Sequence, residues 1–95
     1  MPKIAEFSEG EEVSGIYTIQ MVEYRHFAKK PGRYLRMRIS DDSGSIHAIC
    51  FDPDLMPFEV REGMRIMIQN AKVQDFHGRL RMHFYPGSIH KVDLG

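Results

Sequence analysis

PGRYLRMRISDDSGSIHAICFD, residues 31–52, decides the fold because two alternating strands meet there at a tight turn. In the first strand, Leu35, Met37 and Ile39 share one parity along the chain. Successive side chains of a strand leave opposite faces of its sheet. The strand therefore has one apolar face for a core and a second face that is aromatic and basic. The side chains on that second face are Tyr34, Arg36 and Arg38.

Basic groups beside an aromatic ring on a sheet suit single-stranded nucleic acid, which offers phosphates to the cations and bases to the ring. Arg36 and Arg38 stand two positions apart and can hold successive phosphates or stack on bases. The competing interpretation is that they form cross-strand ion pairs with acidic side chains. His47, on the neighbouring strand, can hydrogen-bond a base or a ribose, although a lone exposed histidine often has no such role. We favour nucleic-acid contacts.

Length and composition narrow the class of protein. A chain of 95 residues predicts one domain, residues 1–95, with a core over about 10–93. Cys50 is the only cysteine and cannot form an internal disulfide, so we expect a cytoplasmic location. No apolar run is long enough to predict secretion or membrane spanning. The net charge of +0 argues against a polyanion binder driven by bulk charge, but segregated charges can still form a positive face.

Two long β segments flank the central hairpin. Residues 13–24 are β-rich with apolar residues in both parities, which predicts a bent strand that contributes to two sheet layers. Residues 64–76 also switch parity, which predicts a bulge near Gln69–Asn70. After a His77-Gly78 turn, residues 79–85 alternate cleanly as a fifth strand. Residues 89–92 form a short tail.

The link between the third and fourth strands has helical start signals but little length. Asp52-Pro53 reads as an N-cap followed by proline at the first helical position, and Pro57 ends the helix early. We expect one turn over this link that places a plug on an open end of the core. The side chains of the predicted plug are Leu55, Met56 and Phe58.

Five strands, two of them long and bent, allow a small sheet to curl closed and lose its edges. The prediction is an all-β, five-stranded Greek-key OB barrel with a short helical plug between strands three and four. A small SH3-like or Sm-like barrel is the competitor. An Sm barrel would open with a helix, and residues 1–10, with Pro2 and Gly10, make a poor one.

Four stretches of the sequence resemble OB-fold nucleic-acid-binding domains of the anticodon-binding superfamily. Similar modules occur in class II aminoacyl-tRNA synthetases, the DNA polymerase III alpha subunit and HD-domain 3′–5′ exoribonucleases. The most specific part of the resemblance is the D-x-S-G turn followed by an alternating strand. The stretches are GIYTI (15–19), LRMRISDDSGSIHAICF (35–51), REGMRIMI (61–68) and VQDFHGRLRM (73–82).

The resemblance implies a ligand face on strands two and three, flanked by the loop between strands one and two and the loop between strands four and five. Many relatives carry an aromatic residue where Arg36 stands, so stacking would pass to Tyr34, Phe27, Phe76 or the arginine planes. Phe27 and Phe76 can also fold back over a barrel end, which is the commoner fate of a single aromatic residue in a loop. The full set of implied nucleic-acid-binding residues is Tyr34, Arg36, Arg38, His47, Ile49, Phe27, Lys29, Lys30, Phe76, His77 and Arg81.

Metal binding and catalysis have little support in the sequence. The five histidines and Cys50 show neither HxxxH nor CxxC spacing. Asp41-Asp42 is a paired carboxylate, but turns favour aspartate because its side chain bonds nearby backbone N–H groups. No nucleophile elbow or glycine-rich phosphate loop is present. We therefore predict no catalytic residue, no metal and no cofactor.

Two functional hypotheses remain. The first is a noncatalytic module that binds single-stranded RNA or DNA, with RNA or tRNA favoured by the resemblance, and that holds substrate for a separate catalytic domain or protein partner. The second is a protein-interaction OB module, a subunit or adaptor whose sheet face or edge contacts a partner. Zero net charge and the arginine at position 36 favour the second hypothesis.

Overall fold

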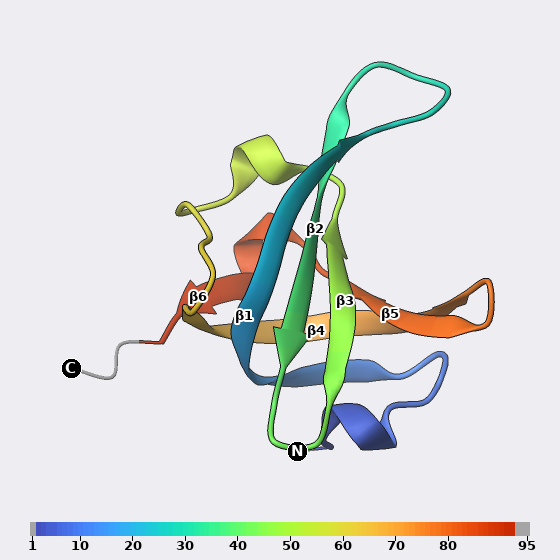
Figure 1. The fold of residues 1–95 in the computed structure, drawn as a ribbon, viewed down its shortest axis with the longest axis vertical. Coiled ribbons are helices and arrows are strands. Elements are labelled where there is room, and N and C mark those ends of the chain that lie inside the picture. The colour runs from blue at the N-terminus through green and yellow to red at the C-terminus, as the bar shows by residue number, and fades with distance from the viewer. Residues whose placement is uncertain (1, 93–95) are drawn as a thin grey trace.

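The computed structural model describes residues 2–92, so positions 1 and 93–95 of the predicted domain lie outside the described residues. The chain forms a curled sheet with three short 3-10 turns (Figure 1). The strands are β1 (Glu12–His26), β2 (Arg33–Ser40), β3 (Ser45–Cys50), β4 (Arg65–Phe76), β5 (Arg79–His83) and β6 (Ile89–Lys91). The 3-10 turns are η1 (Ile4–Glu6), η2 (Pro53–Leu55) and η3 (Pro86–Ser88).

β1 belongs to both layers of the barrel. Its first half pairs antiparallel with β4 and its second half pairs antiparallel with β2. β2 continues into β3, and β3 runs parallel to β5, which closes the ring through the β4–β5 pair. The prediction of an all-β, five-stranded OB barrel is confirmed. The tail at 89–92 adds a short sixth strand, because β6 pairs with the start of β4.

Two bulges let the long strands bend. In β1 the register moves from Ile19 opposite Ile39 to Met21 opposite Arg38, so β1 has one extra residue there. In β4 an extra residue falls at Asn70, whose φ of 55° lies in the left-handed region. Ser14 Oγ accepts a hydrogen bond from the Asn70 amide at 2.9 Å. The predicted bulge near Gln69–Asn70 is therefore confirmed.

The apolar parity of each strand fills the barrel. Leu35, Met37 and Ile39 are each 0% exposed, as the alternation predicts. The core also includes Ile4 and Phe7, which precede the predicted start of the core near residue 10. Their burial depends on a contact that is remote in sequence, because Asp41 Oδ2 accepts a hydrogen bond from the Ile4 amide at 2.9 Å. The N-terminal segment therefore covers one end of the barrel.

The plug between β3 and β4 is a minor feature, a single 3-10 turn followed by irregular chain. Met56 and Phe58 pack against the core as predicted. Leu55 is 72% exposed, so its predicted place in the plug is wrong. Asp52 occupies the N-cap position, but its side chain makes no capping hydrogen bond. Within residues 2–92 no helix has the length and apolar character needed to cross a membrane.

Candidate functional site

Five adjacent strands present their outward side chains on one surface, which we call the outer face. The strand order is β1-β2-β3-β5-β4, and residues paired across neighbouring strands point to the same side of a sheet. One cross-strand row is Met21, Arg38, His47, Arg81 and Gln74. The next row is Glu23, Arg36, Ile49, His83 and Lys72.

Arg36 is already engaged by its neighbours. Its Nη1 lies 2.8 Å from Glu23 Oε1, and its Nη2 lies 3.3 Å from His47 Nε2. Glu23 also lies 3.6 Å from the Nε atom of Arg25, so one carboxylate serves two guanidinium groups. The cross-strand ion pair that competes with phosphate binding thus exists at Arg36.

Arg38 and Arg81, the other two arginines of these rows, have no ion pair with a carboxylate in the part of the chain that the structure describes. Arg38 Nε donates a hydrogen bond to Ser45 Oγ at 3.3 Å. Arg81 Nε donates to His83 Nε2 at 3.0 Å, and its guanidinium lies 3.7 Å from the centre of the Phe76 ring. Neutral partners leave the charge of these arginines uncompensated, so this half of the outer face is positive.

Both histidines of the outer face have lowered pKa values. Burial is the main cause at His47, and the nearby guanidinium groups of Arg36 and Arg38 lower its pKa further, while Glu23 acts in the opposite direction. Burial and Arg81 together lower the pKa of His83. Both rings are therefore neutral at pH 7, since their ordinary pKa is 6.5. Neutral imidazoles can both accept hydrogen bonds and stack.

Four rings form an aromatic cluster across the outer face. The Phe27 centroid lies 5.3 Å from that of Tyr34 and 6.0 Å from that of Phe51, and the Phe51 centroid lies 5.2 Å from that of His83. Lys30 Nζ lies 4.5 Å from the centre of the Phe27 ring. Phe51 is 46% exposed. Phe51 and His83 are absent from the predicted binding residues, although each shares the parity of residues in that set. Phe51 has the parity of His47 and Ile49, and His83 has that of Arg81.

The remaining sequence-predicted residues fall into three groups. Phe76, His77 and Arg81 gather at the β4–β5 hairpin, where the Phe76 and His77 ring centres are 4.3 Å apart. Lys29 is exposed in the β1–β2 loop beside Lys30. Ile49 is on the predicted side of the sheet but only 1% exposed. Neighbouring side chains cover it, so it cannot itself make much contact with a ligand.

The outer face is concave at two places. A groove of about 170 Å³ lies over Ile49, with walls that include Tyr34, Arg36, Phe76 and Arg81. A second groove, of about 400 Å³, is lined in part by Phe51, Lys72, Gln74, His83 and Tyr85. Figure 1 shows the β1–β2 hairpin rising above the barrel and the β4–β5 hairpin extending to its right. Cations, stacked rings and grooves in one surface can hold phosphates and flat bases.

The same residues offer little to a metal ion. Within residues 2–92 no group of three or more histidine, cysteine, aspartate or glutamate side chains converges. Cys50 is buried in the core, and burial raises the pKa of its thiol. A raised pKa keeps the thiol protonated, and the protonated thiol is a poor metal ligand.

The strand order and the closed ring define this chain as an OB-fold domain, and solved structures agree. It is similar to the OB domain of a Thermoplasma acidophilum protein, with a TM-score of 0.79 and 22% identity over 99% of this chain and 88% of that chain. It is also similar to a replication factor A-related protein from Methanobacterium thermoautotrophicum, with a TM-score of 0.77 and 24% identity over 98% and 91% of the two chains.

A murine DNA-binding protein bound with double-stranded DNA has a TM-score of 0.68 and 16% identity over 94% of this chain and 45% of that chain. No protein-family model matches the sequence, and no curated protein matches it. At these identities the similarities establish the fold. Membership of the anticodon-binding superfamily stays a prediction.

Proposed function

We propose that this OB domain is a noncatalytic module that binds single-stranded nucleic acid across its outer face. The observation that carries the proposal is the aromatic cluster of Phe27, Tyr34, Phe51 and His83 on the same surface as Arg38 and Arg81, whose hydrogen-bond partners are neutral. Proteins that bind single strands combine a positive groove with rings on which bases stack. Both parts occur here on one surface.

The aromatic cluster supports base stacking because its rings are not needed to fill the barrel. Phe27, Tyr34 and Phe51 lie outside the hydrophobic core cluster, and they contact one another. Apolar rings left partly in water on a sheet face tend to mark a binding surface. Stacking one base on such a ring contributes roughly 1–3 kcal/mol to binding.

The arginines supply the phosphate contacts. Glu23 is the only carboxylate of residues 2–92 that forms an ion pair with an outer-face arginine. The net charge of +0 is a property of the whole chain and does not describe this surface, where Arg38 and Arg81 have neutral hydrogen-bond partners. A local positive field attracts a polyanion even when the whole molecule is neutral.

The structural neighbours support nucleic acid as the class of ligand. One is a replication factor A-related protein and another is a DNA-binding protein bound with double-stranded DNA. The RNA preference that the sequence resemblance implies, and the cytoplasmic location, stay predictions. Attachment to a catalytic domain or another protein partner also stays a prediction.

Fluorescence anisotropy with labelled single-stranded RNA and DNA of one sequence, at low and moderate salt, tests the proposal. We expect salt-sensitive binding that falls about thirtyfold to a hundredfold when Tyr34→Ala is combined with Phe51→Ala, since two stacked bases are lost. Tyr24→Ala is the matched control, because Tyr24 is 43% exposed and packs on Arg33 away from the cluster.

Thermal unfolding of each variant checks that the barrel is intact. Absence of salt-sensitive binding, or binding that the double variant leaves unchanged, would overturn the proposal. The protein-interaction module would then be the better hypothesis. The comparison of RNA with DNA decides between the two nucleic acids.

A further inference from the structure

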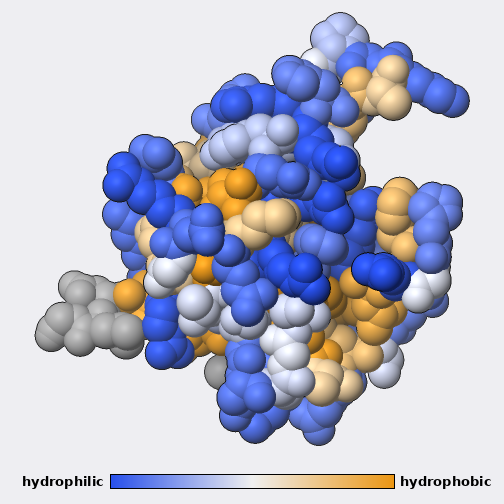
Figure 2. Space-filling view, viewed as in Figure 1, coloured by the Kyte–Doolittle hydropathy of each residue, from blue (hydrophilic) through white to orange (hydrophobic). Residues whose placement is uncertain are grey.

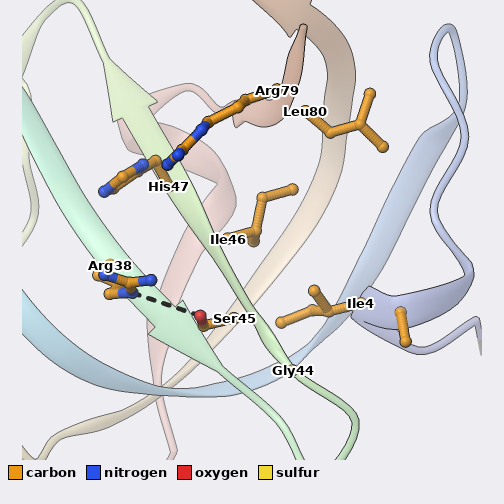
Figure 3. Close-up of a pocket in the computed structure, with 9 residues that line it drawn as sticks. Ile4, Arg38, Gly44, Ser45, Ile46, His47, Arg79 and Leu80 are labelled. Atoms are coloured by element: carbon orange, nitrogen blue, oxygen red, sulfur yellow. Dashed lines mark hydrogen bonds between the residues drawn. The ribbon is translucent and has the colours of Figure 1, made fainter.

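A pocket of about 330 Å³ lies beside the outer face, between η1, the start of β3 and the β4–β5 hairpin. Figure 3 shows Arg79 reaching toward His47, while Arg38 is hydrogen-bonded to Ser45. Figure 2 shows apolar surface, in orange, between the β4–β5 hairpin and the N-terminal segment. The apolar side chains of the pocket are those of Ile4, Ile46 and Leu80.

The pocket gathers positive charge without a counter-ion. Arg79 makes no side-chain hydrogen bond or ion pair within residues 2–92, and Arg38 bonds only the neutral Ser45 hydroxyl. The pKa of His47 is lowered chiefly by burial, then by Arg36 and Arg38, with a smaller contribution from Arg79. Three guanidinium groups therefore lie close enough to His47 to disfavour its protonation, and Glu23 alone opposes them. An anion in the pocket would relieve this repulsion.

One wall of the pocket is fixed in place by the β2–β3 turn. The amides of Ile4 and Ala5 donate to Asp41 Oδ2 at 2.9 Å and to Ser43 Oγ at 3.0 Å. Lys3 Nζ adds an ion pair with Asp42 at 2.9 Å. The N-terminal segment is thus tied to the turn at three consecutive residues, Lys3, Ile4 and Ala5. A single strand of nucleic acid that crosses the outer face toward this turn would meet the N-terminal segment. It would therefore end there or leave the surface.

We propose that this pocket binds the terminal phosphate of a single strand, with Arg38 and Arg79 holding the phosphate and the last base resting on Leu80. A terminal phosphomonoester carries a charge of about −1.5 to −2 at pH 7, whereas an internal phosphodiester carries one negative charge. Two uncompensated guanidinium groups match the larger charge, and planar guanidinium groups bind phosphate through paired hydrogen bonds. The inference rests on the proposed function, because the rest of the strand occupies the outer face.

The experiment compares three labelled oligonucleotides of one sequence, which carry a 5′-phosphate, a 3′-phosphate or hydroxyl groups at both ends. We expect one of the two phosphorylated strands to bind about tenfold more tightly than the hydroxyl-ended strand, as for one added charge-assisted contact. Arg79→Gln removes that difference. Arg61→Gln, which changes an exposed arginine paired with Glu59 outside the outer face, preserves it.

A spectroscopic measurement accompanies the affinities. In NMR titrations the pKa of His47 should rise when the phosphorylated strand binds, and it should rise less with the hydroxyl-ended strand, because only the former brings a dianion beside the ring. Arg38→Gln should reduce the rise. A merely structural role for Arg38 would leave it unchanged.

Equal affinity for the three strands, or a preference that survives Arg79→Gln, overturns the terminal-phosphate inference. In that outcome the hydroxyl-ended strand still binds and remains sensitive to Phe51→Ala, so the proposed function stands. Failure of the proposed function looks different: no strand binds at low salt, whatever its ends. A preference for one phosphorylated end that disappears in Arg79→Gln supports both.

Discussion

Arg36 and Arg38 are two positions apart on one face of one strand, yet their surroundings differ. Arg36 lies opposite Glu23 on β1 and shares that carboxylate with Arg25. Arg38 lies opposite Met21, and no carboxylate pairs with it among residues 2–92. The outer face therefore has two halves. In the neutralised half, Arg25 and Arg36 share Glu23 and lie near the aromatic rings. In the positive half, Arg38 has no carboxylate partner within residues 2–92.

The difference shows that a residue's role depends on the register across the sheet as well as on its own strand. We expect bases to stack in the neutralised half, near Phe51, and phosphates to bind in the positive half, near Arg38. A charge already paired gains little from a phosphate, because it must give up one anion to bind another.

The largest expected effect comes from the positive half. Arg38→Gln combined with Arg79→Gln should weaken binding of the preferred phosphorylated strand about a hundredfold at low salt, since two charge-assisted contacts are lost. The slope of log K against log salt should flatten by about 1.4, or about 0.7 for each lost phosphate contact. Anisotropy over a salt series measures both.

Arg36→Gln is the matched variant in the neutralised half, and we expect it to weaken binding only about threefold, as for a surface ion pair. An equal or larger loss at Arg36 would break the distinction between the two halves.

The aromatic cluster should give the next largest effect. Phe51→Ala is expected to weaken binding about tenfold, within the range of roughly 1–3 kcal/mol for one stacked base, without changing the salt slope. Because Phe51 is 46% exposed and lies outside the core cluster, the melting temperature should change little. A loss of stability without loss of binding would mean that the cluster is structural.

A smaller effect, of opposite sign, should follow from removing the shared carboxylate. Glu23→Gln keeps the shape of the side chain and releases Arg25 and Arg36 from it. We expect binding to strengthen about threefold, on the scale of one exposed ion pair. Weaker binding in this variant would show instead that Glu23 orients Arg36 for the ligand.

The smallest effect concerns pH. The pKa values of His47 and His83 are lowered in the folded state, so below their ordinary value of 6.5 the unfolded chain binds more protons than the folded chain. Their contribution to stability is present above pH 6.5 and is lost as the pH falls through the folded-state pKa values. Since both rings are partly exposed, we expect a change below about 1 kcal/mol between pH 7.5 and 5.5.

Thermal unfolding at the two pH values measures this change, and His47→Gln combined with His83→Gln should reduce it. Carboxylates contribute little in this range, since the ordinary aspartate pKa is 3.8. An unchanged pH dependence in the double variant would assign the effect to other groups.

Strict alternation made much of the fold predictable, because a period of two fixes which side chains of β2 and β5 enter the core. The Glu23–Arg36 pair was not predictable to the same degree. It exists because the bulge in β1 at Gln20 shifts the register by one residue. Without that bulge Glu23 would lie opposite Leu35 and face the core side of the sheet.

Two other differences have separate causes. Burial of Ile4 requires a hydrogen bond to Asp41, which is distant in sequence and leaves no local signal at the N-terminus. Leu55 was assigned to the plug on hydrophobicity alone, and a single 3-10 turn exposes it. Phe51 could have been predicted by continuing the alternation of β3 for one more step.

The strand that joins the two layers has a consequence for how the chain folds. The first half of β1 finds its hydrogen-bond partner only in β4, and the ring closes only when β3 reaches β5. Native contacts between such distant segments slow folding, with β barrels of this kind taking roughly milliseconds to seconds. During synthesis the start of β1 therefore waits, with its edge unpaired, until Arg65–Phe76 has been made. That interval is when pairing with another chain competes with closing the barrel.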